Sequence, residues 1–259
     1  MSPLWSRRHD VIVLSHDGIG LCLAGSGRLR QLAEASTQPL LELEQQAPAL
    51  GLRRVRILLC NQWLRYSVLP WQAGVYSEAD WRALAAHQFR QQYGAAAESW
   101  DLRVSLQGYG QPAVACALDA GLIAQLTGIA RNAGWTLLAI EPALMAVFNR
   151  HRAKLAQADH WLLMAEPQRL VLAQLGAGVW QHFYIDSPLA GEEAASAQRL
   201  IGQALHLQGA TAPTAIACFG PATMLPTQLA EAIPLLRLPA YLSSGQRDDS
   251  HLHLLAGVA

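Results

Sequence analysis

The stretch VRILLCNQWLRYSVL, residues 55–69, begins the part of the chain that decides the fold. Its two apolar runs, at 55–59 and 63–69, are rich in β-branched and aromatic residues and therefore predict two strands. The pattern then predicts a helix, two strands, a helix, a strand and a last helix. The three later strands read DLRVSL, AVACAL and TLLAI, at residues 101–106, 113–118 and 136–140. This alternation predicts an α/β fold, and the run contains no catalytic motif.

Local signals support the first of these helices and the hairpin that follows it. Ser77 is a good helix cap, and the acids Glu78 and Asp80 that follow it suit the positive end of a helix. Helically spaced apolar residues then continue to Gly94, which ends the helix. The turn residues YGQP at 109–112 separate two strands, so residues 101–118 are predicted to form a hairpin.

A three-stranded meander is predicted near the N-terminus. The apolar run DVIVLS at 10–15 is followed by His16-Asp17-Gly18, and a returning strand covers 19–24. Asp-Gly is a strong signal for a two-residue hairpin turn. A third strand is predicted at 29–33. A second meander, with turns at EPQ and GAG, is predicted for residues 161–185.

The two meanders indicate an internal duplication. After the second meander the pattern predicts a helix, a strand, a helix and a closing strand, at 192–207, 214–219, 226–232 and 252–258. Two units that begin with three strands and continue with helices and strands predict a duplicated α/β architecture. The expected halves are residues 1–159 and 160–259, and the first half carries an inserted subdomain at about 71–149.

Composition limits the classes of function. The chain of 259 residues has 19 basic and 19 acidic residues and no basic stripe, so we expect no nucleic-acid partner. The four cysteines show no CxxC pair or metal-ligand spacing, which favours buried, reduced thiols in a cytosolic protein. The first ten residues lack the apolar core of a signal peptide, and no apolar run reaches the ~20 residues needed to span a bilayer. We therefore expect a soluble protein.

Four short sequence segments between Ser77 and Asn149 resemble those of a known family. They are a helix ending QQYG, a hairpin ending VACALD, a helix ending ARNAGW, and LLAIEPALMAVFN. This segment resembles the inserted subdomain of PilM, the actin-like cytoplasmic component of type IV pilus machines. It is also similar to the cytoplasmic part of the type II secretion L protein and to MshI. The resemblance implies a duplicated actin-like (RNase H-like) fold with an inserted α/β subdomain.

The same resemblance gives three positions at which active members of the actin and hexokinase superfamily bind nucleotide. Two hairpins with Asp-x-Gly-type turns hold the phosphates and the magnesium ion, because backbone N–H groups cradle phosphate oxygens and a carboxylate holds the metal or its waters. A paired-glycine turn near the C-terminus receives the adenosine.

This sequence departs from that pattern at all three positions. The first, DGIG at 17–20, is explained by a hairpin turn at least as well as by a displaced phosphate turn. The second, AEPQR at 165–169, has no glycine, and its proline removes an N–H donor. The third, FGPA at 219–222, has one glycine and again a proline. We therefore expect no catalytic residue, no bound cofactor and no metal.

The resemblance and these departures together predict a non-catalytic scaffold of a type IV pilus or type II secretion assembly. The implied partner is an inner-membrane pilus or secretion protein, whose short cytosolic peptide docks in a groove beside the inserted subdomain. A second contact with the assembly motor ATPase follows by analogy with the secretion protein. The expected location is the cytoplasm, peripheral at the inner membrane through that partner.

Two other functions stay open at the level of sequence. The chain is alternatively an active ATPase or small-molecule kinase with divergent motifs, and magnesium–ATP is then its cofactor. In that case Asp17 holds the metal, and Gly18, Gly20 and Gly220 contact the nucleotide. A third alternative is an orphan module that regulates twitching or adhesion outside the machine core.

Aromatic and arginine residues give the candidate partner surface. Trp63, Arg65 and Trp71 lie around the strand that leads into the inserted subdomain, and such residues often anchor protein interfaces. The alternative is that they fill the seam between subdomains. His251 and His253 alternate on the predicted closing strand and would share a face, but a metal site there lacks an evident third ligand.

Overall fold

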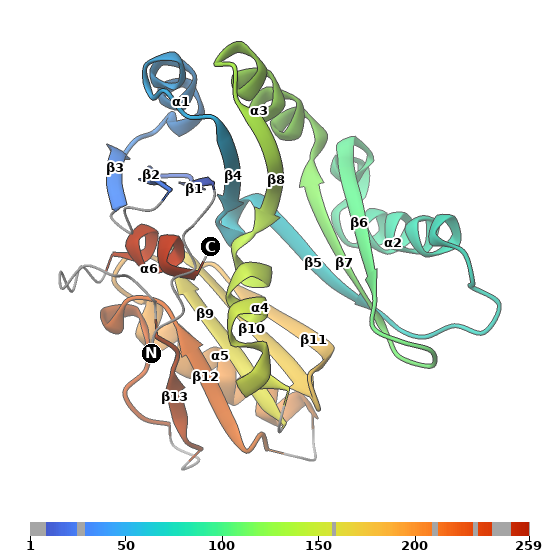
Figure 1. The fold of residues 1–259 in the computed structure, drawn as a ribbon. Coiled ribbons are helices and arrows are strands. Elements are labelled where there is room, and N and C mark those ends of the chain that lie inside the picture. Colours follow the sequence, from blue (N-terminus) through green and yellow to red (C-terminus); the bar gives the residue numbers. More distant parts are fainter. Residues whose placement is uncertain are drawn as a thin grey trace. The chain divides into compact units, whose positions relative to one another are not determined.

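A computed structural model describes residues 9–24, 29–156, 159–208, 212–229, 233–239 and 250–258, without the side chain of His253. The chain divides into two compact units. Unit 1 contains residues 1–63, 121–150 and 239–259, and unit 2 contains residues 64–120 and 151–238. Figure 1 shows the elements of both units, each of which is described below by itself.

Unit 1 is built on a five-stranded sheet with the strand order β3-β2-β1-β4-β8. The strands are β1 (Asp10–Leu14), β2 (Gly18–Cys22), β3 (Leu29–Glu34), β4 (Arg54–Leu59) and β8 (Thr136–Pro142). The first three form an antiparallel meander, whereas β4 runs parallel to both β1 and β8. Four consecutive β1 residues, 11–14, are fully buried, as expected for a central strand covered on both faces.

Four helices belong wholly or partly to unit 1. They are α1 (Pro39–Gln46), α3 (Ala120–Asn132), the first part of α4 (Ala143–Leu155) and α6 (His251–Val258). The last of these returns from the C-terminal end of the chain and packs on β1 and β2 (Figure 1). The C-terminal residues therefore complete the core that the N-terminal meander begins.

Unit 2 repeats the same sheet topology in the order β11-β10-β9-β12-β13. Its strands are β9 (His160–Glu166), β10 (Arg169–Gly176), β11 (Val179–Asp186), β12 (Ala215–Phe219) and β13 (Leu235–Arg237). The meander is again antiparallel, and β12 is parallel to its neighbours β9 and β13. Helix α5 (Glu193–Gln208) packs its apolar side on this sheet. In both sheets the strands therefore follow the order third, second, first, fourth, fifth.

Unit 2 also contains a three-stranded antiparallel sheet in the order β5-β7-β6. Its elements are β5 (Leu64–Leu69), α2 (Glu78–Tyr93), β6 (Trp100–Leu106) and β7 (Ala113–Asp119). Helix α2 buries Trp81, Ala85 and Phe89 against one face of this sheet. The alternate residues Ala113, Ala115 and Ala117 of β7 and the 3.6-residue spacing on α2 produce this core.

The predicted duplicated architecture is confirmed, but its boundaries differ from those expected. The insertion was predicted at about 71–149, whereas β8 pairs with β4 in the sheet of unit 1, so α3 and β8 do not belong to the insertion. The predicted halves 1–159 and 160–259 also differ from the compact units, because the chain crosses between the units several times. Parallel pairing between distant strands leaves no local sequence signal, which explains the difference.

Three local predictions are also corrected. The closing strand at 252–258 is wrong, because these residues form the helix α6; short apolar runs are ambiguous between the two structures. A helix was predicted at 226–232, but residues 226–229 are not helical and residues 230–232 lie outside the described part. The short edge strand β13 was not predicted at all.

Candidate functional site

The first candidate phosphate turn is the turn between β1 and β2. The register pairs Leu14 with Ile19, so the central turn residues are His16 and Asp17, not Asp17 and Gly18 as predicted. Within the turn the Ser15 N–H donates to the Gly18 carbonyl at 3.0 Å, and the Ser15 hydroxyl donates to Asp17 Oδ1 at 2.5 Å. The Asp17 carboxylate is therefore bonded within its own turn.

The two glycines after this turn allow close packing inside unit 1. A Cβ atom on Gly18 would lie 3.1 Å from the Ala33 carbonyl oxygen and 3.2 Å from Leu252 Cδ1. A Cβ atom on Gly20 would lie 2.9 Å from Leu29 Cδ1. Both glycines are strand residues of β2, and they leave room for β3 and for the C-terminal helix α6.

His251 lies at the start of α6, beside the same turn. Its Nε2 atom is 3.9 Å from Asp17 Oδ1, and burial lowers the pKa of this histidine while the Asp17 carboxylate opposes the shift. The expected strand that would have placed His251 and His253 on one face is wrong, because both residues belong to the helix α6. Among the described residues no group of three or more His, Cys, Asp or Glu side chains could hold a metal ion.

The second candidate turn joins β9 to β10 through Pro167 and Gln168. A buried carboxylate from the start of α5 accepts a hydrogen bond from one backbone donor of this turn, the Gln168 N–H. Glu193, which is 5% exposed, accepts hydrogen bonds from the N–H groups of Gly191 at 2.8 Å and Gln168 at 3.5 Å. A phosphate group needs such N–H donors, and the negative charge of Glu193 would repel it.

The third candidate turn follows β12 at Gly220. This residue has a φ of 143°, and a Cβ atom here would lie 2.4 Å from the Ala165 carbonyl oxygen. The glycine is therefore required by the close approach of two backbone segments within unit 2. Each of the candidate residues Asp17, Gly18, Gly20 and Gly220 thus has a role inside its own unit.

The candidate partner residues Trp63, Arg65 and Trp71 do not form one cluster within a unit. Trp63 belongs to unit 1, in a short 3-10 turn, whereas Arg65 and Trp71 belong to unit 2. Arg65 is the second residue of β5, and Trp71 follows two residues after the strand ends, so they are separated by roughly 20 Å at about 3.3 Å per residue. Trp71 contacts two other aromatic rings, those of Trp81 and Tyr109.

Arg65 lies near a second arginine at the beginning of β10. The Arg65 guanidinium lies 6.0 Å from the centroid of the Tyr93 ring. Burial, and then the positive charge of Arg65, lower the pKa of Arg169. Both guanidinium groups donate to the Leu64 carbonyl, at 2.9 Å from Arg65 and 3.5 Å from Arg169.

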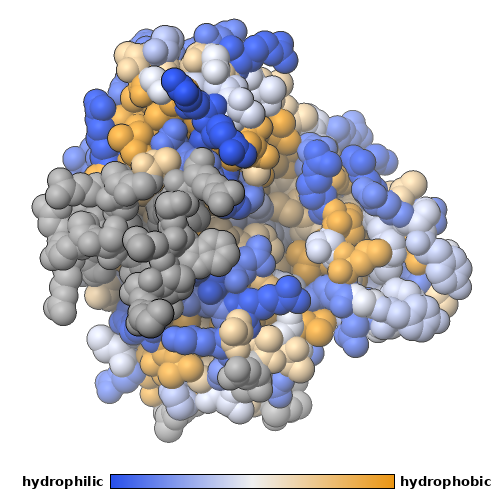
Figure 2. Space-filling view, in the orientation of Figure 1, coloured by the Kyte–Doolittle hydropathy of each residue, from blue (hydrophilic) through white to orange (hydrophobic). Residues whose placement is uncertain are grey.

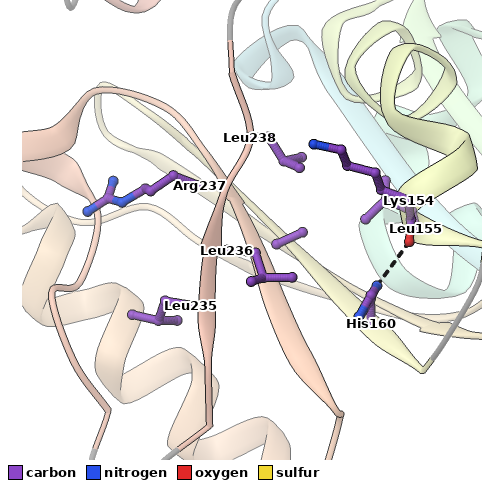
Figure 3. Close-up of a pocket in the computed structure, with 8 residues that line it drawn as sticks. Lys154, Leu155, His160, Leu235, Leu236, Arg237 and Leu238 are labelled. Atoms are coloured by element: carbon purple, nitrogen blue, oxygen red, sulfur yellow. Dashed lines mark hydrogen bonds between the residues drawn. The ribbon is translucent and has the colours of Figure 1, made fainter.

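A pocket of about 270 Å³ lies in unit 2 between the end of α4, the start of β9 and the strand β13. Figure 3 shows that Lys154 extends toward Leu238, whereas Arg237 points away from it. The His160 ring nitrogen Nδ1 lies 3.1 Å from the Lys154 carbonyl oxygen. The rest of the lining is Leu155, Ala217, Leu235 and Leu236, so the lining combines leucines with these cationic and imidazole groups and contains no nucleophile paired with a base.

The duplicated sheets and the inserted three-stranded sheet define the class of fold as actin-like. The cytoplasmic domain of EpsL, an inner-membrane component of the type II secretion system of Vibrio cholerae, is similar with a TM-score of 0.65 and 13% identity. That match covers 96% of this chain and 93% of the EpsL chain. A chain from the PilM–PilN type IV pilus biogenesis complex is similar with a TM-score of 0.63 and 13% identity, over 98% of both chains.

A third similar structure has no known function. It is a protein with an actin-like ATPase fold from Bacteroides thetaiotaomicron, with a TM-score of 0.62 and 11% identity, and the match covers 100% of this chain and 98% of that one. No protein-family profile and no curated protein sequence matches the chain. In the described part of the chain, no helix is long and apolar enough to cross a membrane. At these identities the comparisons confirm the predicted actin-like fold.

Proposed function

We propose that this protein is a non-catalytic, actin-like scaffold of a bacterial type IV pilus or type II secretion assembly. The observation that carries the proposal is the extent of the two matches. Both units and the inserted three-stranded sheet are covered when the chain is compared with the EpsL cytoplasmic domain and with the chain from the PilM–PilN complex. A likeness of whole chains supports a shared mode of assembly better than a likeness of one sheet does.

The proposed partner is an inner-membrane protein of the same assembly, bound through a short cytosolic peptide. EpsL is itself described as an inner-membrane component, and the PilM structure is a complex with PilN. A bound tail would hold this chain peripherally at the inner membrane. A second contact, with the assembly motor ATPase, belongs to the same proposal.

The interactions of the three candidate turns support a non-catalytic role. Asp17 accepts the hydroxyl hydrogen bond of Ser15, and Glu193 accepts a hydrogen bond from the Gln168 N–H of the second turn. Gly220 accommodates the Ala165 carbonyl oxygen. Magnesium–ATP would have to displace contacts of this kind, so we expect no nucleotide cofactor.

Co-purification tests the scaffold proposal directly. The full chain, tagged in its native host and extracted with mild detergent, is expected to enrich an inner-membrane pilus or secretion protein. Recovery of none of these proteins would overturn the proposal. A chain that regulates twitching or adhesion outside the machine would instead recover other partners.

An active ATPase or small-molecule kinase is the second candidate, and the actin-like ATPase fold of the Bacteroides protein is the observation that favours it. Calorimetry with magnesium–ATP separates the two candidates. The scaffold predicts no binding heat at millimolar nucleotide. Micromolar binding that is lost in Asp17→Ala would establish the second candidate, because that substitution removes the only carboxylate of the first turn.

A further inference from the structure

Three aromatic residues lie in two loops at one end of the three-stranded sheet; Tyr76 and Tyr109 are exposed, and Trp71 is partly buried. We call their surface the aromatic face and define it as Trp71, Tyr76 and Tyr109. Trp71 and Tyr76 lie in the loop between β5 and α2, and Tyr109 lies in the turn between β6 and β7, beside that loop (Figure 1). Tyr109 is 89% exposed and Tyr76 is 74% exposed. Residues of intermediate hydropathy cover this end in Figure 2.

The aromatic face has a rigid base. The ring centroids of Trp71 and Tyr109 are 5.0 Å apart in an edge-on arrangement, and the fully buried ring of Trp81 lies 5.9 Å from that of Trp71. Gly108 and Gly110, with φ values of 140° and 72°, form the turn that presents Tyr109. An exposed aromatic ring on an ordered support loses little conformational entropy on binding, which is typical of residues that dominate protein interfaces.

Two acidic residues, Glu78 and Asp80, follow Tyr76 in the first turn of α2. Glu78 lies one helical turn before Trp81 and therefore on the same side of α2. The Asp80 carboxylate is held at the start of that helix by the Ser77 hydroxyl at 2.7 Å and by the Ser77 N–H at 3.2 Å. Within the described residues neither carboxylate forms an ion pair with a basic side chain. The nearest arginines along α2 and β6 are Arg82 and Arg103, and both lie within 4 Å of the Asp101 carboxylate, at 3.9 Å and 3.1 Å.

We propose that the aromatic face binds an arginine-containing peptide segment of a partner protein. Guanidinium groups stack on the rings of Trp71 and Tyr109 and pair with the carboxylates of Glu78 and Asp80. Arginine combines a planar, weakly hydrated cation with an apolar stem, so it matches a surface of aromatic rings beside acids. Anionic lipid headgroups do not match, because the two carboxylates repel them.

The source of that segment rests on the proposed function. Cytosolic residues next to a membrane-spanning helix are rich in lysine and arginine. The cytosolic tail of a single-pass inner-membrane protein therefore carries the required charge close to the bilayer. The aromatic face then receives the basic part of the tail and holds the scaffold near the membrane.

Fluorescence anisotropy with a defined probe tests the chemistry of the surface. The probe is a fluorescein-labelled peptide of alternating arginine and leucine, and its control has citrulline at every arginine position. We expect the arginine peptide to bind at least about tenfold more tightly, and Tyr109→Ala to weaken it by about tenfold, as for a central interface residue. Because Tyr109 is 89% exposed, its removal leaves the fold intact. Leu207→Ala, at a 72% exposed position on α5, is the matched control and should change nothing.

A second measurement uses the cytosolic tail of the inner-membrane protein that co-purifies with the chain. Binding of the tail that weakens in both Tyr109→Ala and Glu78→Gln supports this inference. Binding of the tail that neither substitution changes overturns the inference and leaves the proposed function standing. If only the arginine peptide binds, and Tyr109→Ala weakens it, the surface chemistry is supported and the tail-binding function fails. Absence of all binding overturns both.

Discussion

The side-chain amide of Gln107 pairs with both backbone groups of Trp180. Trp180 N–H donates to Gln107 Oε1 at 2.7 Å, and Gln107 Nε2 donates to the Trp180 carbonyl at 2.9 Å. Gln107 follows the end of β6, and Trp180 is the second residue of β11. The glutamine amide thereby links the three-stranded sheet to the five-stranded sheet of unit 2. The ring contact of Tyr66 with Phe183 lies between the same two sheets.

Replacement of Gln107 by alanine should loosen this connection. The variant loses these two hydrogen bonds and a third, from Gln107 Nε2 to the Pro112 carbonyl at 3.0 Å. At about 1 kcal/mol each, we expect a decrease of about 1–3 kcal/mol in the free energy of unfolding, measured in urea. Gln111→Ala is the control, because Gln111 is an exposed residue of the same turn. Equal losses in the two variants would contradict a specific role for the Gln107 pair.

Gly220 should tolerate no side chain even when nucleotide is absent. Gly220→Ala places a Cβ atom 2.4 Å from the Ala165 carbonyl oxygen at a φ of 143°. We therefore expect the free energy of unfolding to fall by more than about 2 kcal/mol. Gly202→Ala, inside α5, meets no atom within 4 Å and should be neutral or stabilising by up to about 1 kcal/mol. Thermal unfolding measures both variants. A Gly220→Ala protein as stable as the original would show that this glycine has no packing role.

Gly18 and Leu252 should be energetically coupled. Leu252 is 2% exposed, and its Cδ1 atom lies 3.2 Å from the position of a Cβ on Gly18. Leu252→Ala should therefore lower the free energy of unfolding by about 2–4 kcal/mol. Gly18→Ala should lower it by about 0.5–1 kcal/mol less in the Leu252→Ala background than in the original protein. Urea unfolding of the four proteins gives this coupling. Gly128→Ala, at a helix position with no neighbour within 4 Å, should combine additively with Leu252→Ala.

The capping box at the start of α2 gives a prediction on pH. The hydrogen bond from the Ser77 side chain, and then the one from its backbone, lower the pKa of Asp80 below its ordinary value of 3.8. A lowered folded-state pKa contributes stability above the unfolded value, and this contribution disappears as the pH falls through the folded value.

Ser77→Ala should raise the pKa of Asp80 part of the way toward 3.8, because the backbone N–H of residue 77 remains. An NMR titration of the Asp80 carboxyl carbon measures this change, and Ser105→Ala, at an exposed position on β6, is the control. An unchanged pKa in Ser77→Ala would mean that the serine hydroxyl does not bond to the carboxylate in solution.

The elements that carry a strong local pattern could be predicted from the sequence. The cap at Ser77, the stop at Gly94 and the helical spacing between them define α2 almost to the residue. Alternating apolar residues likewise locate β6, and short continuous apolar runs locate β4 and β7. These signals are local, because they depend on backbone geometry within a few residues.

The candidate functional residues were less predictable. Trp71 was identified by its residue type, but its ring partner Tyr109 was not, although a tyrosine between two glycines in a predicted turn is a usable signal for an exposed position. Glu193 has no such signal in the sequence. Its bonds to Gly191 and Gln168 depend on how α5 approaches the β9–β10 turn, and no sequence pattern reports that approach.

The sequence by itself determined most of the strands and helices, the two meanders and the absence of the usual phosphate-binding pattern. All of these follow from local residue preferences and spacing. Only the tertiary structure decided that β8 joins the sheet of unit 1, that the last residues form a helix over Gly18 and Gly20, and that Tyr109 contacts Trp71. Such contacts join residues far apart in the chain, and their free energy depends on packing that exists only once the chain has folded.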